Sequence, residues 1–280
     1  MKPSFHDSVH LNFAISPCPN DTYIFHALKN IQGFAPGIET SFVFADVEAL
    51  NGMALRSEPD VCKLSFHAYA YCHNNYRLLG SGSALGHACG PLLISKRKIY
   101  PDELRDVHIA IPGKLTTANL LLGIAFREAT RKTEYVFSDI ETVVLDGECD
   151  AGLIIHENRF TYEKKGLRKI IDLGEWWENN FNLPIPLGGI AIKRSIAPHI
   201  AETVEQAIRN SIVYSHTHQS EALAFCRSLS QVMDEKVLQQ HINLYVNDYS
   251  INLGEKGRQA INFLFARAIE TEIISNGVEL

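Results

Sequence analysis

The feature that most constrains the fold of this chain is an alternation between short apolar segments and longer segments with helical periodicity. The short segments predict strands at residues 9–15, 40–44, 61–65, 91–95, 107–111, 151–155, 170–173 and 190–193. The longer segments predict helices at residues 20–30, 47–56, 67–73, 116–130, 200–215, 220–229, 234–246 and 254–273. Strands that alternate with helices are typical of the α/β class of folds.

The order of these elements also predicts how the chain divides. The strands near residues 91–96 and 189–194 are expected to pass between two lobes. Residues 1–96 and 189–280 would form a discontinuous larger α/β lobe, and residues 97–188 an inserted smaller one. A ligand is expected in the cleft between the lobes, where small molecules commonly bind. The pattern gives no information on the oligomeric state.

Composition and charge exclude several classes of partner. The formal net charge is −6 and no basic helix-turn-helix segment is present, so nucleic acid and anionic membranes are not expected as partners. No stretch approaches the ~18 uninterrupted apolar residues of a membrane helix. Residues 1–12 lack the apolar core of a signal peptide. We therefore expect a cytoplasmic protein.

The chain carries no recognisable metal or cofactor motif. None of its six cysteines forms a C-x-x-C pair or zinc-ligand spacing with a histidine pair, so free thiols in a reducing compartment are expected. The glycine-rich segment at residues 80–90 is not a dinucleotide fingerprint, because Leu85 occupies the third glycine position and a strand follows.

A proline-rich turn, S-P-C-P-N-D-T at residues 16–22, follows the first predicted strand. Asn20 or Asp21 is expected to cap the helix that begins there. The free N–H groups of a helix start can bind an anion, and the two prolines reduce the entropy lost when the turn is fixed. An ordinary capped turn explains the same residues equally well.

A second strand–loop–helix segment, G-K-L-T-T-A-N, lies at residues 113–119. A carboxylate could accept hydrogen bonds from the Thr117 hydroxyl and the Ala118 amide together at this helix start. The spacing of a P-loop is absent. Simple helix capping is the alternative.

The short strand at residues 61–65 ends in Lys63, Leu64 and Ser65. In open α/β sheets, ligands bind beyond the carboxyl ends of the strands, so Ser65 is placed where a ligand would lie. The Lys63 side chain could instead be an ordinary solvated lysine.

A histidine follows the most apolar predicted strand, in the segment G-L-I-I-H-E-N at residues 152–158. The imidazole of His156 can accept a proton near neutral pH, so this residue is a candidate general base. The next residue, Glu157, would point the opposite way on a continuing strand and need not be its partner. H-E-N-R-F is not the H-E-x-x-H of zinc proteases. A structural role is the alternative for His156, and packing is the expected role of Trp176 and Trp177.

Taken together, several segments resemble the 1,4-dihydroxy-6-naphthoate synthases of the futalosine route of menaquinone biosynthesis. The matching segments include SPCPNDTYIFHAL, KLSFHAYA, PGKLTTA, GECDAGLIIHENRFTY and LPIPLGGIAI, and they are spread over nearly the whole chain. The resemblance implies a type 2 periplasmic-binding-protein-like fold with two α/β lobes and an interlobe cleft. It implies conversion of cyclic de-hypoxanthine futalosine, a small-molecule carboxylate, into 1,4-dihydroxy-6-naphthoate, with no metal or organic cofactor.

The resemblance also implies roles for particular residues. His156 would be the general base of a carbon–carbon lyase, and Lys63, Leu64, Ser65, Thr117 and Ala118 would contact the substrate. Three other classes of protein are compatible with the fold. They are a solute-binding protein without chemistry, chorismate dehydratase of the same pathway, and the effector lobe of a regulator.

Overall fold

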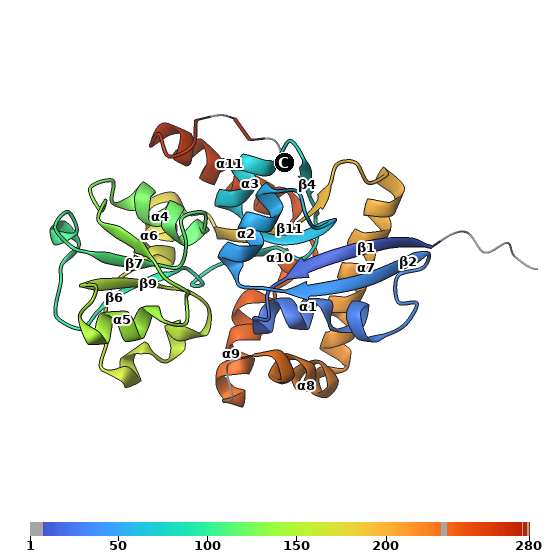
Figure 1. Ribbon diagram of the computed structural model, residues 1–280, viewed down its shortest axis with the longest axis horizontal. Coiled ribbons are helices and arrows are strands. Elements are labelled where there is room, and N and C mark those ends of the chain that lie inside the picture. Colours follow the sequence, from blue (N-terminus) through green and yellow to red (C-terminus); the bar gives the residue numbers. More distant parts are fainter. Residues whose placement is uncertain (1–7, 231–233, 276, 279) are drawn as a thin grey trace, which may run out of the picture.

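The computed structural model describes residues 8–230, 234–275, 277–278 and 280. Residues 1–7, on which the expected lack of a signal peptide partly rests, lie outside these ranges. The chain forms two α/β lobes, each built on one mixed β-sheet (Figure 1). The predicted fold class, a two-lobed periplasmic-binding-protein-like α/β fold, is therefore confirmed.

The larger lobe is built on a sheet with the order β2-β1-β3-β11-β4, and β5 pairs with β11. Its strands are β1 (Val9–Ile15), β2 (Ile38–Phe44), β3 (Val61–Ser65), β4 (Tyr76–Leu78), β5 (Ala84–Gly86) and β11 (Ile185–Lys193). Because β1 and β3 pair in parallel, their carboxyl ends meet at one edge of the sheet. The segments that follow β1 and β3 therefore start side by side.

The smaller lobe is built on a sheet with the order β10-β6-β9-β7-β8. Its strands are β6 (Leu92–Ser95), β7 (Ile109–Ile111), β8 (Lys132–Glu134), β9 (Ala151–Ile154) and β10 (Arg168–Asp172). β7 and β9 pair in parallel, so the segments after them also begin at one edge. β6 pairs within this sheet, whereas β11 pairs only within the larger one. The lobe boundaries near residues 96 and 189 stay a prediction.

Helices cover both sheets (Figure 1). They are α1 (Pro19–Asn30), α2 (Val47–Leu55), α3 (Phe66–Cys72), α4 (Thr117–Ala125), α5 (Ile140–Asp146), α6 (Leu173–Phe181), α7 (Pro198–Thr217), α8 (Gln219–Leu229), α9 (Glu235–Tyr245), α10 (Asp248–Ile251) and α11 (Gly254–Glu270). The described residues also form three short 3₁₀ helices: η1 (Pro101–Glu103), η2 (His156–Phe160) and η3 (Tyr162–Lys165). Within the described ranges, no helix combines the length and apolar character needed to cross a membrane.

Two of the predicted element boundaries differ most from the structure. α4 ends at Ala125 and not near residue 130, because Phe126 leaves the helical region with φ −139° and ψ 83°. β11 begins at Ile185 and not at residue 190, because the segment P-I-P-L-G-G is extended and pairs with β5 and β3. The longer strand brings Leu187 and Gly188 to the space between the lobes.

One continuous apolar core joins the lobes on the side of α3, α4, α6 and α11. It includes Leu64 of the larger sheet, Leu121 of α4, Trp177 of α6 and Leu264 of α11. Trp177 is fully buried against aromatic neighbours, so its predicted packing role is confirmed. Because this core crosses the lobe boundary, it holds the two sheets together beside the space between them.

Residues 87–91 join β5 of the larger sheet to β6 of the smaller one, and residues 182–184 join α6 to β11. In the first of these connections, the backbone of Gly90 lies against that of Gly174. A Cβ atom on Gly90 would lie 2.2 Å from the Gly174 nitrogen, closer than any side chain can be accommodated. Glycine at both positions allows this close approach, which fixes where β6 and α6 begin relative to the larger lobe.

Candidate active site

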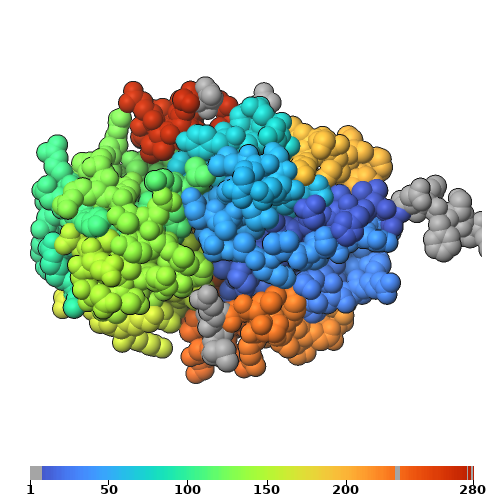
Figure 2. Space-filling view, in the orientation of Figure 1, coloured from blue at the N-terminus to red at the C-terminus, as the bar shows by residue number. Residues whose placement is uncertain are grey.

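A cavity between the lobes gathers all six residues predicted to act in catalysis or substrate contact. The wall from the larger lobe comes from the ends of β1 and β3, and the wall from the smaller lobe from the starts of α4 and η2. The lining residues are Ser16, Asn20, Asp21, Val47, Lys63, Leu64, Ser65, Ala84, Cys89, Pro91, Thr116, Thr117, Ala118, Ile155, His156, Leu187, Gly188 and Tyr245. On the face shown in Figure 2, the green smaller lobe abuts the blue part of the larger one along a narrow seam.

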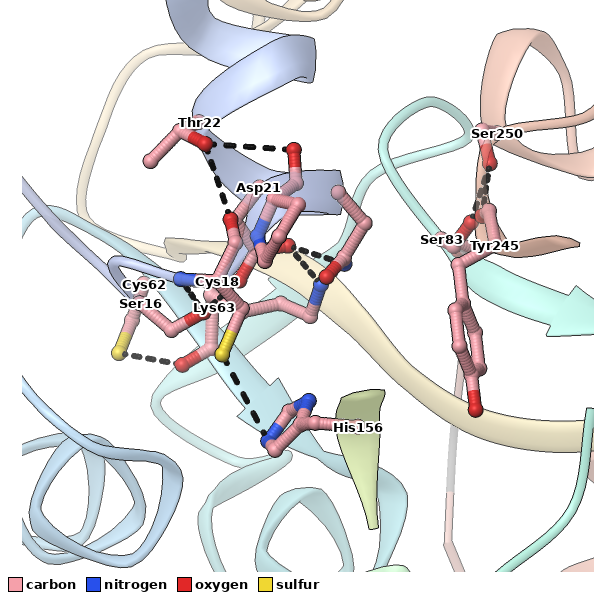
Figure 3. A network of polar contacts seen from close by, with 12 residues as sticks. Ser16, Cys18, Asp21, Thr22, Cys62, Lys63, Ser83, His156, Tyr245 and Ser250 are labelled. Carbon is pink, nitrogen blue, oxygen red and sulfur yellow. Dashed lines mark hydrogen bonds and ion pairs between the residues drawn. The ribbon is translucent and has the colours of Figure 1, made fainter. Parts of the chain in front are cut away.

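Lys63 is the only charged residue of β3, and its side chain is buried. Its ammonium group forms an ion pair with the buried carboxylate of Asp21, on the first turn of α1 (Figure 3). The Ser16 hydroxyl donates to the same carboxylate at 2.6 Å, and the Asn20 amide donates to it at 2.9 Å. A buried ammonium needs such a partner, so the reading of Lys63 as a solvated lysine is wrong.

The proline-rich turn differs from its prediction in one respect. Cys18, and neither Asn20 nor Asp21, is the N-cap residue of α1, and Pro19 is its first residue. Proline suits this position because the first N–H groups of a helix have no intrahelical acceptor. Asp21 instead turns its carboxylate toward Lys63. That negative charge opposes an anion at this helix start, so the turn is no simple anion site.

His156 lies just beyond β9, which ends at Ile154. Its φ of 58° is in the left-handed region, a conformation that costs an ordinary residue roughly 1–2 kcal/mol. The chain therefore turns at His156 and does not continue as a strand. The Nε2 atom lies 3.7 Å from Sγ of Cys18 (Figure 3). The ring also meets Phe137 edge-on at 4.9 Å between centroids.

The electrostatic surroundings favour a neutral imidazole. Removal from bulk water lowers the pKa of His156 to about 4; the nearby Asp21 raises this pKa and Lys63 lowers it, both by less than the effect of burial. The ring is therefore uncharged at neutral pH and can accept a proton. Burial raises the pKa of Cys18, so its thiol stays protonated and cannot act as a thiolate.

The segment that carries His156 is anchored by Arg159. Its guanidinium donates to the carbonyl of Gly90 at 2.5 Å and to the carboxylate of Asp172 at 3.2 Å. Asp172 also caps α6 by accepting from the N–H of Gly174 at 2.8 Å. η2 is thus tied to the same connection at which the chain enters the smaller lobe.

Thr117 and Ala118 form the first turn of α4, with Thr116 as the N-cap residue. The Thr117 hydroxyl donates to the carbonyl of Leu187 in β11. The hydroxyl proton of Thr117 is therefore already donated to Leu187. A carboxylate at this helix start would accept from the free backbone N–H groups instead. The predicted placement of both residues on the cavity wall agrees with the structure.

Ser65 is the last residue of β3 and is held by Asn51 of α2. The Asn51 amide donates to the Ser65 hydroxyl at 3.3 Å and accepts from the Ser65 N–H at 2.9 Å. Glu48, on the same helix, accepts from Asn51 and from the N–H of Leu115 in the smaller lobe, both at 2.9 Å. Asn51 and Glu48 therefore connect the end of β3 to the loop before α4.

Apolar side chains complete the cavity beside these polar groups. They are Val47, Leu64, Ala84, Pro91, Ile155 and Leu187, with the aromatic ring of Tyr245. A mainly apolar cavity with few polar groups is typical of a small-molecule site and suits a flat ring that carries a carboxylate. Across the described ranges, no group of three or more His, Cys, Asp or Glu side chains is arranged to hold a metal ion.

Sequence reasoning missed Asp21 and Tyr245 as parts of the cavity wall. A lysine in an otherwise apolar strand was a usable signal, because a buried ammonium requires an acidic partner. Tyr245 had no comparable signal. It reaches the cavity from the last residue of α9, and its position depends on how that helix packs.

The fold and the site together define a class of protein: a two-lobed α/β protein with a periplasmic-binding-protein-like fold and a cavity between its lobes. The alkanesulfonate-binding protein SsuA from Xanthomonas axonopodis pv. citri has this fold, with a TM-score of 0.70 at 12% identity, over 98% of this chain and 96% of that one. Protein AF1704 from Archaeoglobus fulgidus is more similar, with a TM-score of 0.88 at 35% identity, over 96% and 100% of the two chains.

A family model described as menaquinone biosynthesis matches residues 11–270. The chain belongs to this family of menaquinone-biosynthesis enzymes. A 1,4-dihydroxy-6-naphthoate synthase from Thermus thermophilus is 39% identical to it, over 92% of this chain and 93% of the relative. A protein of the same name from Streptomyces coelicolor is also 39% identical, over 92% of each chain. The predicted family is therefore confirmed.

Proposed function

We propose that this chain is a 1,4-dihydroxy-6-naphthoate synthase that converts cyclic de-hypoxanthine futalosine into 1,4-dihydroxy-6-naphthoate, as a carbon–carbon lyase. The relatives with this name, similar over nearly the whole chain, support the activity. One observation carries the proposal further: an uncharged imidazole, His156, shares a cavity with the helix start at Thr117 and Ala118.

In this proposal, the substrate is held at two places in the cavity. Its carboxylate binds at the start of α4, where the N–H groups of Thr117 and Ala118 and the positive end of the helix dipole favour an anion. Lys63, Leu64 and Ser65 contact it from the larger lobe. The apolar wall then fixes the ring system, which brings the reacting carbon toward His156.

The proposed reaction begins when His156 removes a proton from the substrate as a general base, a role typically worth 10²–10⁴-fold in rate. The electron pair released in this way breaks a carbon–carbon bond in the sense of a retro-aldol step. A sugar-derived fragment leaves, and formation of the aromatic naphthalenediol provides the driving force. No cofactor takes part in this scheme.

The test is direct conversion of substrate by the purified protein. Cyclic de-hypoxanthine futalosine is expected to yield a product with the absorbance and mass of 1,4-dihydroxy-6-naphthoate. Parallel incubation with chorismate tests for its enolpyruvyl elimination product, which a chorismate dehydratase would form. Binding of either compound without any product would favour a solute-binding protein and overturn the proposal.

We also propose that the protein works in the cytoplasm. All six cysteines are free and buried. Unpaired thiols are usual in a reducing compartment. Fractionation of cells that produce the protein tests this location.

A further inference from the structure

A chain of polar contacts runs from the cavity wall into the protein behind His156. It starts at Asp21, whose carboxylate accepts from the side-chain amide nitrogen of Asn20 at 2.9 Å. The orientation of the Asn20 amide is fixed by this contact, because a carboxylate cannot donate. The amide oxygen of Asn20 therefore faces the Nε2 atom of His241, 2.9 Å away on α9.

The contact with Asn20 determines the tautomer of His241. An amide oxygen only accepts, so Nε2 of His241 carries the hydrogen. The other ring nitrogen, Nδ1, lies 3.9 Å from Oε2 of Glu157 in η2. Both atoms are buried, and neither has a hydrogen-bond partner among the described residues, because 3.9 Å is beyond hydrogen-bond distance. A lone pair on Nδ1 and an ionised carboxylate would repel, so one proton belongs between them.

The surroundings indicate which of the two groups holds that proton. Burial raises the pKa of Glu157, and the nearby carboxylate of Glu141 raises it further. Burial also lowers the pKa of His241 well below its usual value, with smaller contributions from the nearby His156 and Lys63. Both shifts favour the same state, a protonated carboxyl beside a neutral imidazole.

We propose that protonated Glu157 and neutral His241 form a positioning pair for His156, in which a small approach of the two side chains closes the 3.9 Å gap and lets the Glu157 hydroxyl donate to Nδ1 of His241. This inference deepens the proposed function, on which it rests. Neither residue contacts the cavity, so both act through His156.

The pair holds His156 in two ways. Glu157 is the next residue along the chain, so fixing its side chain opposes relaxation of the left-handed backbone at His156. The ring of His241 lies nearly parallel to that of His156, with 6.2 Å between centroids and 21° between planes. α9 belongs to the larger lobe and η2 to the smaller one, so the pair also links the lobes directly behind the proposed base.

Other groups around the pair determine how it titrates. Glu157 faces the Glu141 carboxylate of α5, which forms an ion pair with Lys165 of η3. Glu157 also lies near the Cys18 thiol. His241 faces positive charge from Lys63 and Arg159, and its ring packs against Tyr245. The negative Glu141 favours a protonated Glu157, and the cations favour a neutral His241.

The first experiment measures kcat and KM as functions of pH for the whole protein. In the wild type, kcat should fall as the pH rises through the raised pKa of Glu157, because ionisation removes the donor. Glu157→Gln keeps a donor at all pH values, so this alkaline fall should disappear, with kcat within about threefold of the wild-type maximum. Glu157→Ala should lose about tenfold or more in kcat with little change in KM, because His156 is displaced while binding persists.

Matched controls separate positioning from folding. Glu175→Gln neutralises an exposed carboxylate on α6 and should leave both kinetic constants and the pH profile unchanged. His241→Gln can donate to Asn20 and accept from Glu157, so it should retain more activity than His241→Leu, which can do neither. An unchanged alkaline limb in Glu157→Gln, or equal kcat in Glu157→Ala and the wild type, would overturn the positioning role.

A second measurement does not depend on turnover. Infrared spectra of the wild type near neutral pH should contain a carbonyl band of a buried protonated carboxylic acid, and Glu157→Gln should lack it. If the wild type shows this band but converts no substrate, the proposed function fails while the proton assignment stands. If the band is absent, the pair as described here is wrong, whatever the activity.

Discussion

The Nε2 atom of His156 lies 3.7 Å from the Sγ atom of Cys18, across the boundary between the two lobes. Cys18 precedes α1 in the larger lobe, and His156 begins η2 in the smaller one. The proposed base is therefore placed against the other lobe as well as within its own. The pKa of the imidazole therefore depends on how the two lobes meet, because residues of both lobes exclude water from the ring.

Replacement of His156 by asparagine should abolish turnover and leave substrate affinity within about threefold, since general base catalysis is worth roughly 10²–10⁴-fold. Asparagine cannot accept the proton but preserves polarity and approximate size. Calorimetric binding and product formation by the same preparation check both expectations. His199→Asn, on the exposed start of α7, is the control and should behave as the wild type. A variant at position 156 with normal turnover would disprove the base assignment.

The acid limb of the pH profile should report the lowered pKa of His156. A base must be unprotonated, so kcat/KM should rise as the pH increases through about 4, before the alkaline fall that ionisation of Glu157 is expected to cause. The direction follows from burial, which disfavours the imidazolium ion and keeps the neutral ring available at lower pH than usual. Steady-state rates measured from below the expected pKa of about 4 up to neutral pH test this, with circular dichroism at each pH to check that the protein stays folded. A limb near the ordinary value of 6.5 would contradict an enclosed base.

Removal of the Thr117 hydroxyl should weaken substrate binding more than it slows chemistry. In Thr117→Val, the β11 carbonyl of Leu187 loses its donor and the start of α4 shifts relative to the cavity. We expect KM to rise about tenfold, because a shifted helix start weakens the charge-assisted hydrogen bonds from its backbone N–H groups to the carboxylate, with a smaller change in kcat. Thr117→Ser keeps the hydroxyl and should retain a KM close to that of the wild type. Equal KM values for the two variants would argue against a carboxylate site at this helix start.

Neutralising one member of the Asp21–Lys63 pair should destabilise the fold. Asp21→Asn leaves a buried ammonium without its counter-charge, at an expected cost of about 3–5 kcal/mol in the free energy of unfolding. The double variant Asp21→Asn with Lys63→Met removes both charges and should recover most of that loss. Urea denaturation of the wild type, both single variants and the double variant gives the coupling energy. Additive effects of the two substitutions would show that the charges do not interact.

Much of the fold could be predicted because strands and helices here have regular local signals. Asp46, a residue type favoured at helix starts, precedes α2 and caps it, with its carboxylate accepting from two N–H groups. The ends of β3 and β9 also lie at the interlobe cavity, where Ser65 and His156 line the wall, while their role toward a ligand stays a prediction. These predictions rest on interactions between residues close together in the sequence.

The rest of the site depends on contacts between distant segments. Asp21 meets Lys63 from another element, and His241 approaches Glu157 from a helix of the other lobe. Lys63 in an apolar strand signals that an acidic partner exists, but no local pattern identifies Asp21 as that partner or brings His241 to Glu157. The left-handed turn at His156 was also missed, because the apolar run that precedes it predicts a strand that simply continues.

Because all six cysteines are free and buried, their reactivity toward a thiol reagent would show when parts of the protein open. Cys89 faces the interlobe cavity and Cys18 touches the base from across it, whereas Cys62, Cys72 and Cys226 lie within the packed interior of the larger lobe. A thiol reagent should therefore modify Cys89 and Cys18 whenever the lobes separate. It should modify Cys62, Cys72 and Cys226 only when the larger lobe unfolds. The order in which these sulfur atoms react, with and without substrate, would time the motion of the lobes without any added label.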